Sequence, residues 1–335
     1  MAADVLEFTS HGYGGFVFDR DGQKREFTGY RADAVTDYAL DYLRQPKEKP
    51  FFLFVSYLEP HFQNDTGRHE GPAGSKDRFR DFAVPADLEG LPGDWQEEMP
   101  DYLGCCESLD RNVGRIVETL KEQGFYENTI LFYTSDHGSH FRTRNAEYKR
   151  SCHDASLHIP LIVKGGCFDG GRRVSSLVSL IDYAPTLLTC GGVTPPAGMP
   201  GIPLQRILAS PEAARREVFV QISESCVGRA LRTEDWTYAV EGENPESEAA
   251  ASVYREAYLY DLKADPAQHC NLVREPALGP VRDALRARLL ASIREAEGVE
   301  PAILPAEEQA GVPSSRGAVV RTQPGKGEPP RRFPF

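Results

Sequence analysis

The chain has 335 residues, 40% of them hydrophobic and 26% charged, so it can bury one large core or two ordinary ones. Asp and Glu outnumber Lys and Arg by 50 to 38, and the net charge of −12 argues against nucleic acid or an anionic membrane as the main partner. The seven cysteines are an odd number without CxxC spacing, which indicates neither a disulfide framework nor a zinc ribbon. No apolar stretch is long enough to predict a membrane helix, and the N-terminus lacks the pattern of a signal peptide.

The first half of the chain alternates predicted helices with predicted buried strands. Apolar residues recur at helical spacing over 31–43, and the run "FFLFVSY" (51–57) that follows is apolar on both faces, as in a central strand covered by helices. Residues 61–100 are rich in Gly, Pro and charge, which predicts a long surface excursion. The apolar face of 101–123 predicts a second helix, and 129–135 then predicts a second buried strand.

Three further segments continue this alternation. The sequence predicts strands at 159–165 and 174–179 and a helix at 180–192. An alternating pattern of this kind is typical of an α/β protein with a mostly parallel, helix-covered sheet. Ligands of such sheets bind beyond the carboxyl ends of the strands.

The pattern of predicted elements changes after residue 201. Short half-exposed strands and a helix near 281–295 predict a smaller antiparallel α+β subdomain. The last stretch is rich in Pro and Gly and predicts an extended arm or a disordered tail. The predicted domains are therefore 1–195, 196–304 and 305–335.

Side chains of metal-binding and anion-binding type follow two of the predicted strands. Asp136 and His137 come directly after 129–135, so a carboxylate and an imidazole leave one tight turn. Hard divalent cations favour carboxylate oxygens, and an imidazole can complete such a site. His61 follows the earlier strand, and Lys149 lies in the same loop as Asp136. Each of these residues alone is typical of a solvated turn or loop, whereas the three fragments together favour a site.

Six fragments, in this order, resemble the formylglycine-dependent (type I) sulfatases of the alkaline-phosphatase-like superfamily. They are "PFFLFVSYLEPH", "LDRNVGRIVETLKEQGFYENTILFYTSDHG", "YKRSCHDASLHIPLIVKGG", "LVSLIDYAPTLL", "ALRTEDWTYAV" and "LYDLKADPAQHCNL". Their order is far more specific than any single motif. The resemblance implies an alkaline-phosphatase-like fold and hydrolysis of a sulfate ester, carried by a sulfated carbohydrate or an aryl group.

The resemblance also implies a role for individual residues. Asp136 and His137 match the second pair of calcium ligands of the family. Lys149 matches the lysine that contacts the sulfate and assists departure of the leaving group, and His61 matches the histidine that hydrogen-bonds the ester and can act as a general acid. These roles are physically reasonable, because cations stabilise the negative charge that develops on a sulfuryl group and its leaving oxygen.

Three basic residues beside this predicted pocket have no invariant counterpart in the family. They are His140, Arg142 and Arg144. Such a cluster can bind a sulfated or carboxylated sugar. The alternative is an ordinary solvated loop.

The sequence also departs from the family. The family nucleophile is a formylglycine made in a C/S-x-P-S/A-R motif, behind a strand whose Asp-Asp pair supplies the other calcium ligands, and the 335 residues contain neither. The nearest imitation, "CVGRA" at Cys226, lacks the proline and serine. The chain thus resembles a sulfatase without its first strands, with an incomplete Ca²⁺ ligand set. A complementing N-terminal fragment would supply the missing parts. The cellular location stays open, although family members are often exported.

The main hypothesis is a sulfatase that acts on a sulfated small molecule or carbohydrate and binds neither nucleic acid nor a membrane. Two alternatives remain. One is a non-catalytic sulfatase remnant that binds an anionic ligand or a partner chain. The other is a different alkaline-phosphatase-like enzyme, a phosphodiesterase or phosphonate hydrolase. Those enzymes usually bring additional His and Asp ligands for two metals, whereas Lys149, "RTEDWTY" and "LYDL" favour a sulfatase.

Overall fold

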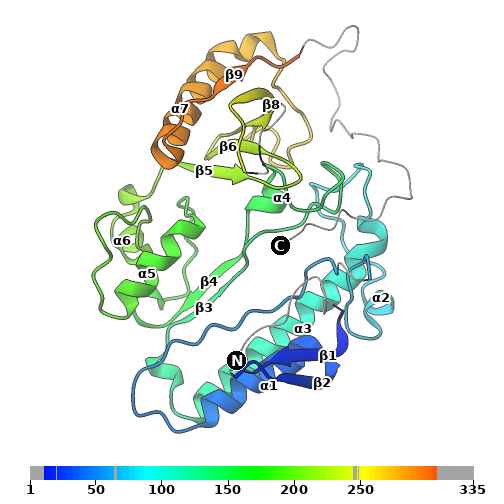
Figure 1. Cartoon of the computed structure of the whole chain (residues 1–335), viewed down its shortest axis with the longest axis vertical. Coiled ribbons are helices and arrows are strands. Elements are labelled where there is room, and N and C mark those ends of the chain that lie inside the picture. Colours follow the sequence, from blue (N-terminus) through cyan, green and yellow to red (C-terminus); the bar gives the residue numbers. More distant parts are fainter. Residues whose placement is uncertain (1–10, 20, 64–65, 244–246, 248, 308–335) are drawn as a thin grey trace. The chain divides into compact units, whose positions relative to one another are not determined.

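The computed structural model describes residues 11–19, 21–63, 66–243, 247 and 249–307 (Figure 1). By its packing the chain divides into two compact units, Met1–Val84 with Asp94–Leu131, and Pro85–Gly93 with Phe132–Phe335. The predicted division at residues 195 and 304 stays a prediction, and most of the predicted tail lies outside the described residues. No described helix is long and apolar enough to cross a membrane.

The first unit is built on two long helices. Strands β1 (Tyr13–Phe18) and β2 (Lys24–Tyr30) form an antiparallel pair, and α1 (Arg31–Arg44) follows β2 directly. A short helix, α2 (Ser75–Arg78), precedes the long helix α3 (Trp95–Glu122). The structure confirms both predicted helices, although α3 begins earlier than predicted and continues through Pro100.

Helices α1 and α3 are joined by polar and apolar contacts. Asp33 of α1 accepts hydrogen bonds from Arg111 (2.9 Å) and Asn112 (2.8 Å) of α3. Ala32 and Leu109 are buried together in the apolar core of this unit. The amphipathic faces seen in the sequence therefore pack against each other.

The apolar run 51–57 does not form the predicted central strand. In the described part of the chain, no backbone hydrogen bond joins this segment to another strand. Its side chains nevertheless alternate as in a strand: the Tyr57 hydroxyl lies 2.8 Å from that of Thr36, whereas Phe52 and Phe54 are 71% and 77% exposed. One face is thus packed and the other is open to solvent.

The second unit contains a two-stranded sheet of β3 (Leu131–Thr134) and β4 (Leu161–Lys164). Three short helices belong to the same unit: α4 (Asp154–Leu157), α5 (Tyr183–Cys190) and α6 (Leu204–Ala209). Its 3₁₀ turns lie at Gly166–Phe168, Leu180–Asp182, Pro211–Ala213 and Pro276–Leu278, and the first unit has one at Tyr126–Asn128. The predicted strand at 174–179 is reduced to one bridge between Leu177 and Arg215.

The C-terminal part of the second unit is a five-stranded sheet with the order β5-β6-β7-β8-β9. Its strands are β5 (Glu217–Ile222), β6 (Gly228–Thr233), β7 (Trp236–Gly242), β8 (Val253–Asp261) and β9 (Ala302–Leu304). Neighbours are antiparallel up to β8, and β9 is parallel to β8. The predicted antiparallel α+β subdomain is therefore present.

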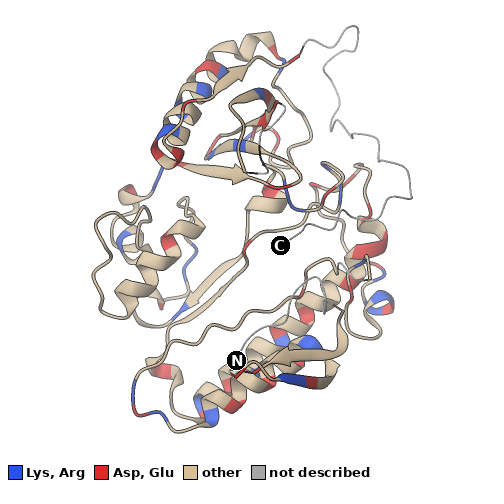
Figure 2. Ribbon diagram, viewed as in Figure 1, with Lys and Arg blue, Asp and Glu red and all other residues tan. Residues whose placement is uncertain are grey.

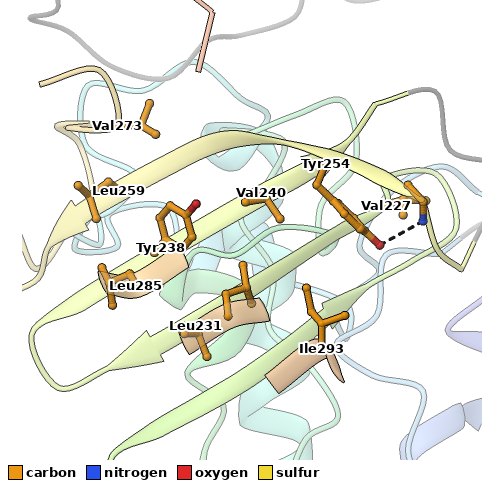
Figure 3. Packing of buried hydrophobic residues seen from close by; sticks show 11 residues of the cluster. Val227, Leu231, Tyr238, Val240, Tyr254, Leu259, Val273, Leu285 and Ile293 are labelled. Atoms are coloured by element: carbon orange, nitrogen blue, oxygen red, sulfur yellow. Dashed lines mark hydrogen bonds between the residues drawn. The ribbon is translucent and has the colours of Figure 1, made fainter. Parts of the chain in front are cut away.

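Helix α7 (Gly279–Glu297) covers one face of this sheet. Leu285 and Ile293 of the helix meet Leu231 and Tyr238 of the strands in a closed apolar cluster (Figure 3). Each fully buried side chain of this size contributes roughly 1.5–3 kcal/mol to folding. Away from the sheet, α7 carries interspersed acidic and basic residues, as a solvated helix face does (Figure 2).

Candidate functional site

The turn after β3 brings Asp136 and His137 together, as the sequence predicts. The Asp136 side chain is 83% exposed, and its Oδ2 atom lies 3.5 Å from His137 Nε2. Its Oδ1 atom accepts a hydrogen bond of 2.9 Å from the His137 backbone N–H. A carboxylate therefore projects into solvent beside an imidazole.

Gly138 gives this turn its position. Its N–H donates to the Ser156 carbonyl (2.8 Å), and a Cβ atom added at Gly138 would lie 2.1 Å from the Ala155 carbonyl oxygen. A backbone oxygen cannot retreat as a flexible side chain can, so only glycine fits here. The Asp136–His137 turn consequently packs directly on α4.

Lys149 lies in the same unit as this turn and presents an unused cation. Its ammonium makes no hydrogen bond or ion pair with any residue that the structure describes. Burial, and then the nearby Arg150, lower the pKa of Lys149, while Asp136 and Glu147 act in the opposite direction. A half-buried ammonium without a hydrogen-bonded partner among the described residues is suited to binding an anion.

Arg150 is placed differently from Lys149, although the two are neighbours in sequence. Its guanidinium forms ion pairs with Glu147 (3.0 Å) and Glu224. Its charge is thereby neutralised within the protein. Lys149 remains the cation of this pair that can meet a ligand.

His61 belongs to the first unit, at the end of the segment that begins with the exposed phenylalanines. Its backbone N–H donates to the Leu58 carbonyl (2.8 Å), which forms a turn directly after the apolar run. The predicted approach of His61 to Lys149 joins the two units and stays a prediction.

Glu59, two residues before His61, is a candidate that the sequence reasoning missed. Its side chain is buried with 3% of the residue exposed, and this burial raises its pKa to about 7, with Arg31 among the smaller opposing influences. A carboxyl group that titrates near neutral pH beside a candidate acid is of functional interest. The available signal was a charged residue directly behind an apolar run.

The three basic residues of the predicted substrate cluster lie in two kinds of environment. His140 is fully buried, and burial lowers its pKa to about 3. Arg144 is 4% exposed and donates to the carbonyls of Gln268 (2.7 Å), Ala267 (3.0 Å) and Asp87 (3.3 Å). Arg142 is half-buried with φ of 57°. His140 and Arg144 thus lie in the interior, which does not fit a solvated loop, and Arg142 is the more accessible of the three.

Polar contacts tie this loop to the C-terminal sheet. The Gln268 side chain accepts from the Asp154 N–H (2.7 Å) and donates to Thr237 of β7 (3.1 Å). Arg232 of β6 donates two hydrogen bonds, of 2.8 and 2.9 Å, to the Asp154 carboxylate. The predicted subdomain is therefore part of what holds the candidate site.

A complete calcium site is not formed by these residues. Across the described ranges, no three His, Cys, Asp or Glu side chains gather as they would around a metal ion. Calcium takes six to eight oxygen ligands, whereas this turn offers the single carboxylate of Asp136. The donors present do not fit the ion without further ligands.

Two family models match the chain, Sulfatase over residues 7–193 and the C-terminal part of N-sulphoglucosamine sulphohydrolase over residues 146–295. The ulvan-active sulfatase of Formosa agariphila is 27% identical over 310 residues, which cover 85% of this chain and 57% of that protein. Arylsulfatase K of Homo sapiens is 31% identical over 184 residues, 51% of this chain and 32% of that protein. The chain thus spans about a third to just over half of these relatives.

Solved structures give the same picture of the fold. The putative sulfatase yidJ from Bacteroides fragilis superposes with a TM-score of 0.69 at 20% identity, over 85% of this chain and 63% of that one. A structure in complex with its substrate D-glucosamine-2-N,6-O-disulfate superposes with a TM-score of 0.63 at 21% identity, over 84% and 73%. These likenesses confirm the predicted fold class.

Proposed function

Because the chain belongs to the sulfatase family, we propose that it provides part of an enzyme that hydrolyses a sulfate ester of a carbohydrate. The observation that supports this most is the half-buried Lys149 ammonium, which has no partner in the described chain and lies near Asp136. A sulfate group bound there would supply the missing anion. His61 is proposed to donate the proton that the leaving alcohol oxygen needs.

The 335 residues contain no C/S-x-P-S/A-R motif, and we propose that the nucleophile comes from polypeptide outside this sequence. We propose that a complementing segment also supplies the calcium ligands that Asp136 and His137 lack. In this arrangement Lys149 stabilises the charge that leaves with the sulfate, and the surrounding loop keeps it oriented. The chain alone would then bind sulfate without turning over an ester.

A saccharide as the carrier of the sulfate is supported by the relatives. One is named for its activity on ulvan, and one solved neighbour holds a disulfated glucosamine. Arg142, next to the candidate site in sequence, has the planar guanidinium that binds carboxylate or sulfate oxygens in pairs. We assign it to substrate binding, with His140 and Arg144 behind it as residues that hold the loop.

Binding of inorganic sulfate to the purified 335-residue chain tests whether the Lys149 ammonium binds an anion. We expect isothermal titration calorimetry to detect binding that is lost in Lys149→Ala and kept in Lys263→Ala, a change at an exposed lysine paired with Asp235. Equal binding by wild type and Lys149→Ala would remove the proposal. Sulfate binding without turnover, even after the missing segment is restored, would favour the non-catalytic alternative.

The phosphodiesterase or phosphonate hydrolase alternative has one observation in its favour. The phosphonate monoester hydrolase of Silicibacter pomeroyi superposes with a TM-score of 0.59 at 23% identity, which shows a shared fold. An assay of the restored full-length enzyme on 4-nitrophenyl sulfate and bis(4-nitrophenyl) phosphate separates the two. Faster turnover of the diester would reverse the ranking.

A further inference from the structure

A cleft of about 370 Å³ opens in the second unit beside α4. Its lining includes Asp87, Asp154, Ala155, His158 and Pro266. A volume of this size lies within the range of small-molecule sites, roughly 300–1,000 Å³. None of the residues predicted to act on the sulfate lines it.

The walls of this cleft are fixed before any ligand arrives. Arg144, buried behind them, donates to the backbone carbonyls of Asp87 and of the two residues Ala267 and Gln268 on the opposite segment. The Gln268 side chain holds the backbone of Asp154. Since the wall is held by a charged group with several bonds, binding there does not have to order a loose loop.

The charges in the cleft indicate the kind of occupant. Asp154 is already neutralised by Arg232, whereas the Asp87 carboxylate has no hydrogen bond or ion pair with the described residues. The lining residues include no Lys or Arg that would balance an anion. Asp87 can accept hydrogen bonds from hydroxyl groups or from an ammonium, His158 offers a second polar group, and Ala155 and Pro266 offer apolar contact. A saccharide ring without an anionic group has this combination.

The cleft adjoins the candidate sulfate site. Ala155 lines the cleft, and its carbonyl packs against Gly138. Gly138 in turn follows Asp136 and His137 directly in the sequence. A ligand that reached from one to the other would cross a single turn of α4. A chain of sugar rings has the shape to do so.

We propose that this cleft is the subsite for a neutral or amino sugar ring joined to the ring that carries the sulfate. The assignment rests on the proposed sulfatase function for the neighbouring ring only. It places the specificity for the unsulfated part of the substrate on Asp87 and His158. Arg144, predicted from the sequence to bind substrate, then acts as a positioning residue for this subsite.

Titrations of the 335-residue chain with D-glucosamine, D-glucuronate and inorganic sulfate, followed by ligand-detected NMR, test the proposal. We expect D-glucosamine to bind about tenfold more tightly than D-glucuronate, because the uronate carboxylate meets Asp87 without a balancing cation. Asp87→Asn should weaken D-glucosamine binding about tenfold, as loss of a hydrogen bond to a charged group does. Glu89→Gln, an exposed carboxylate two residues away, is the matched control and should change nothing.

The outcomes separate this proposal from the sulfatase function. If sulfate binds through Lys149 while D-glucosamine does not bind, or binds Asp87→Asn as well as wild type, the subsite is wrong and the sulfate site stands. If D-glucosamine binding depends on Asp87 while sulfate is not bound, the cleft stands as a saccharide site and the proposed sulfatase function fails. Should Asp87→Asn not fold, His158→Gln on another wall provides the same test with the same expected loss.

Discussion

Neighbouring basic residues of one loop serve different purposes in this protein. Lys149 and Arg144 lie five positions apart, yet the ammonium of Lys149 has no partner in the described chain and the guanidinium of Arg144 is bound by three backbone carbonyls. An unsatisfied hydrogen-bond donor in the interior costs about 1–3 kcal/mol, and both terminal nitrogens of the Arg144 guanidinium have acceptors. The partners of each cation, rather than its type, indicate which one meets the substrate.

At this scale we expect Lys149→Ala to reduce turnover of the restored full-length enzyme by roughly 10²-fold or more, as loss of one electrostatic stabiliser commonly does. The free energy of unfolding should change by less than about 1 kcal/mol, because the side chain is only half-buried and makes few contacts. Steady-state kinetics and urea unfolding provide the two measurements. A variant with full activity would show that this lysine does not act on the substrate.

The pH dependence of sulfate binding provides a second test of the same residue. Because burial and Arg150 lower the pKa of Lys149 below its ordinary value of 10.5, the ammonium loses its proton at a lower pH than a surface lysine does. Sulfate affinity should therefore fall as the pH rises through this lowered pKa. Calorimetric titrations between pH 7 and pH 10 measure it, and constant affinity over that range would assign the binding to an arginine.

Buried histidines predict how stability depends on pH. Burial lowers the pKa of His140 to about 3, so in the folded protein His140 stays neutral where an unfolded histidine takes up a proton below about pH 6.5. The unfolded state therefore binds more protons, and stability falls as the pH decreases below 6.5. From pH 7 to pH 5 this residue should cost about 2 kcal/mol.

Urea unfolding at both pH values tests this expectation. The loss of stability between pH 7 and pH 5 should be smaller by about 2 kcal/mol in His140→Gln than in wild type. His158→Gln, a change at an exposed histidine, is the control and should leave the loss of stability between the two pH values unchanged. Equal losses in wild type and His140→Gln would mean that His140 is reached by water.

At the scale of elements, two segments that the sequence predicts as strands have different outcomes. Strand β7 is paired on both sides within the five-stranded sheet, whereas 51–57 has no paired strand in the described part of the chain. Apolar composition favours a strand but does not supply the neighbour that completes it. An unpaired segment with exposed Phe52 and Phe54 is a place where another strand can add.

Hydrogen exchange detected by mass spectrometry should distinguish these two segments. Backbone amides of 51–57 are expected to exchange much faster than those of β7, because their hydrogen bonds are to water. The double variant Phe52→Lys, Phe54→Lys should keep the free energy of unfolding within about 1 kcal/mol and aggregate less at high concentration. Destabilisation by several kcal/mol would instead show that both rings are buried in solution.

At the scale of the whole molecule, the charge balance and the incomplete site belong together. The net charge of −12 makes a local cation necessary wherever a sulfate binds, and Lys149 provides one. The turn after β3 offers one exposed carboxylate, that of Asp136, for a divalent cation. Under the proposed function, this chain supplies one part of the anion site and one part of the cation site.

We therefore expect the 335-residue chain to bind calcium weakly, with a Kd above about 10⁻⁴ M, because several of the six to eight oxygen ligands are absent. Calorimetry with calcium chloride, with Asp136→Asn as the matched variant, measures this. Addition of the proposed complementing segment should raise the affinity by orders of magnitude. Micromolar affinity of the chain alone would contradict the view that its ligand set is incomplete.

The sequence by itself determined the four longest described helices, most of the C-terminal strands and the position of Asp136, His137 and Lys149 in one loop. Helix and strand periods are local properties, because the side chains that share a face recur at fixed spacing. Family motifs are local as well, which is why the fold class could be predicted from six short fragments. None of this required knowledge of a distant contact.

The tertiary structure alone decided which polar side chains are buried. Arg144 donates a hydrogen bond to the carbonyl of Gln268, 124 positions away, and no local sequence pattern predicts such a partner. In the same way, 51–57 has the composition of a central strand, but pairing requires a second strand that the described chain does not provide. The cleft beside α4 arises from segments near residues 87, 155 and 266, which only folding brings together. Burial and pairing depend on distant parts of the chain, whereas a sequence motif records only its neighbours.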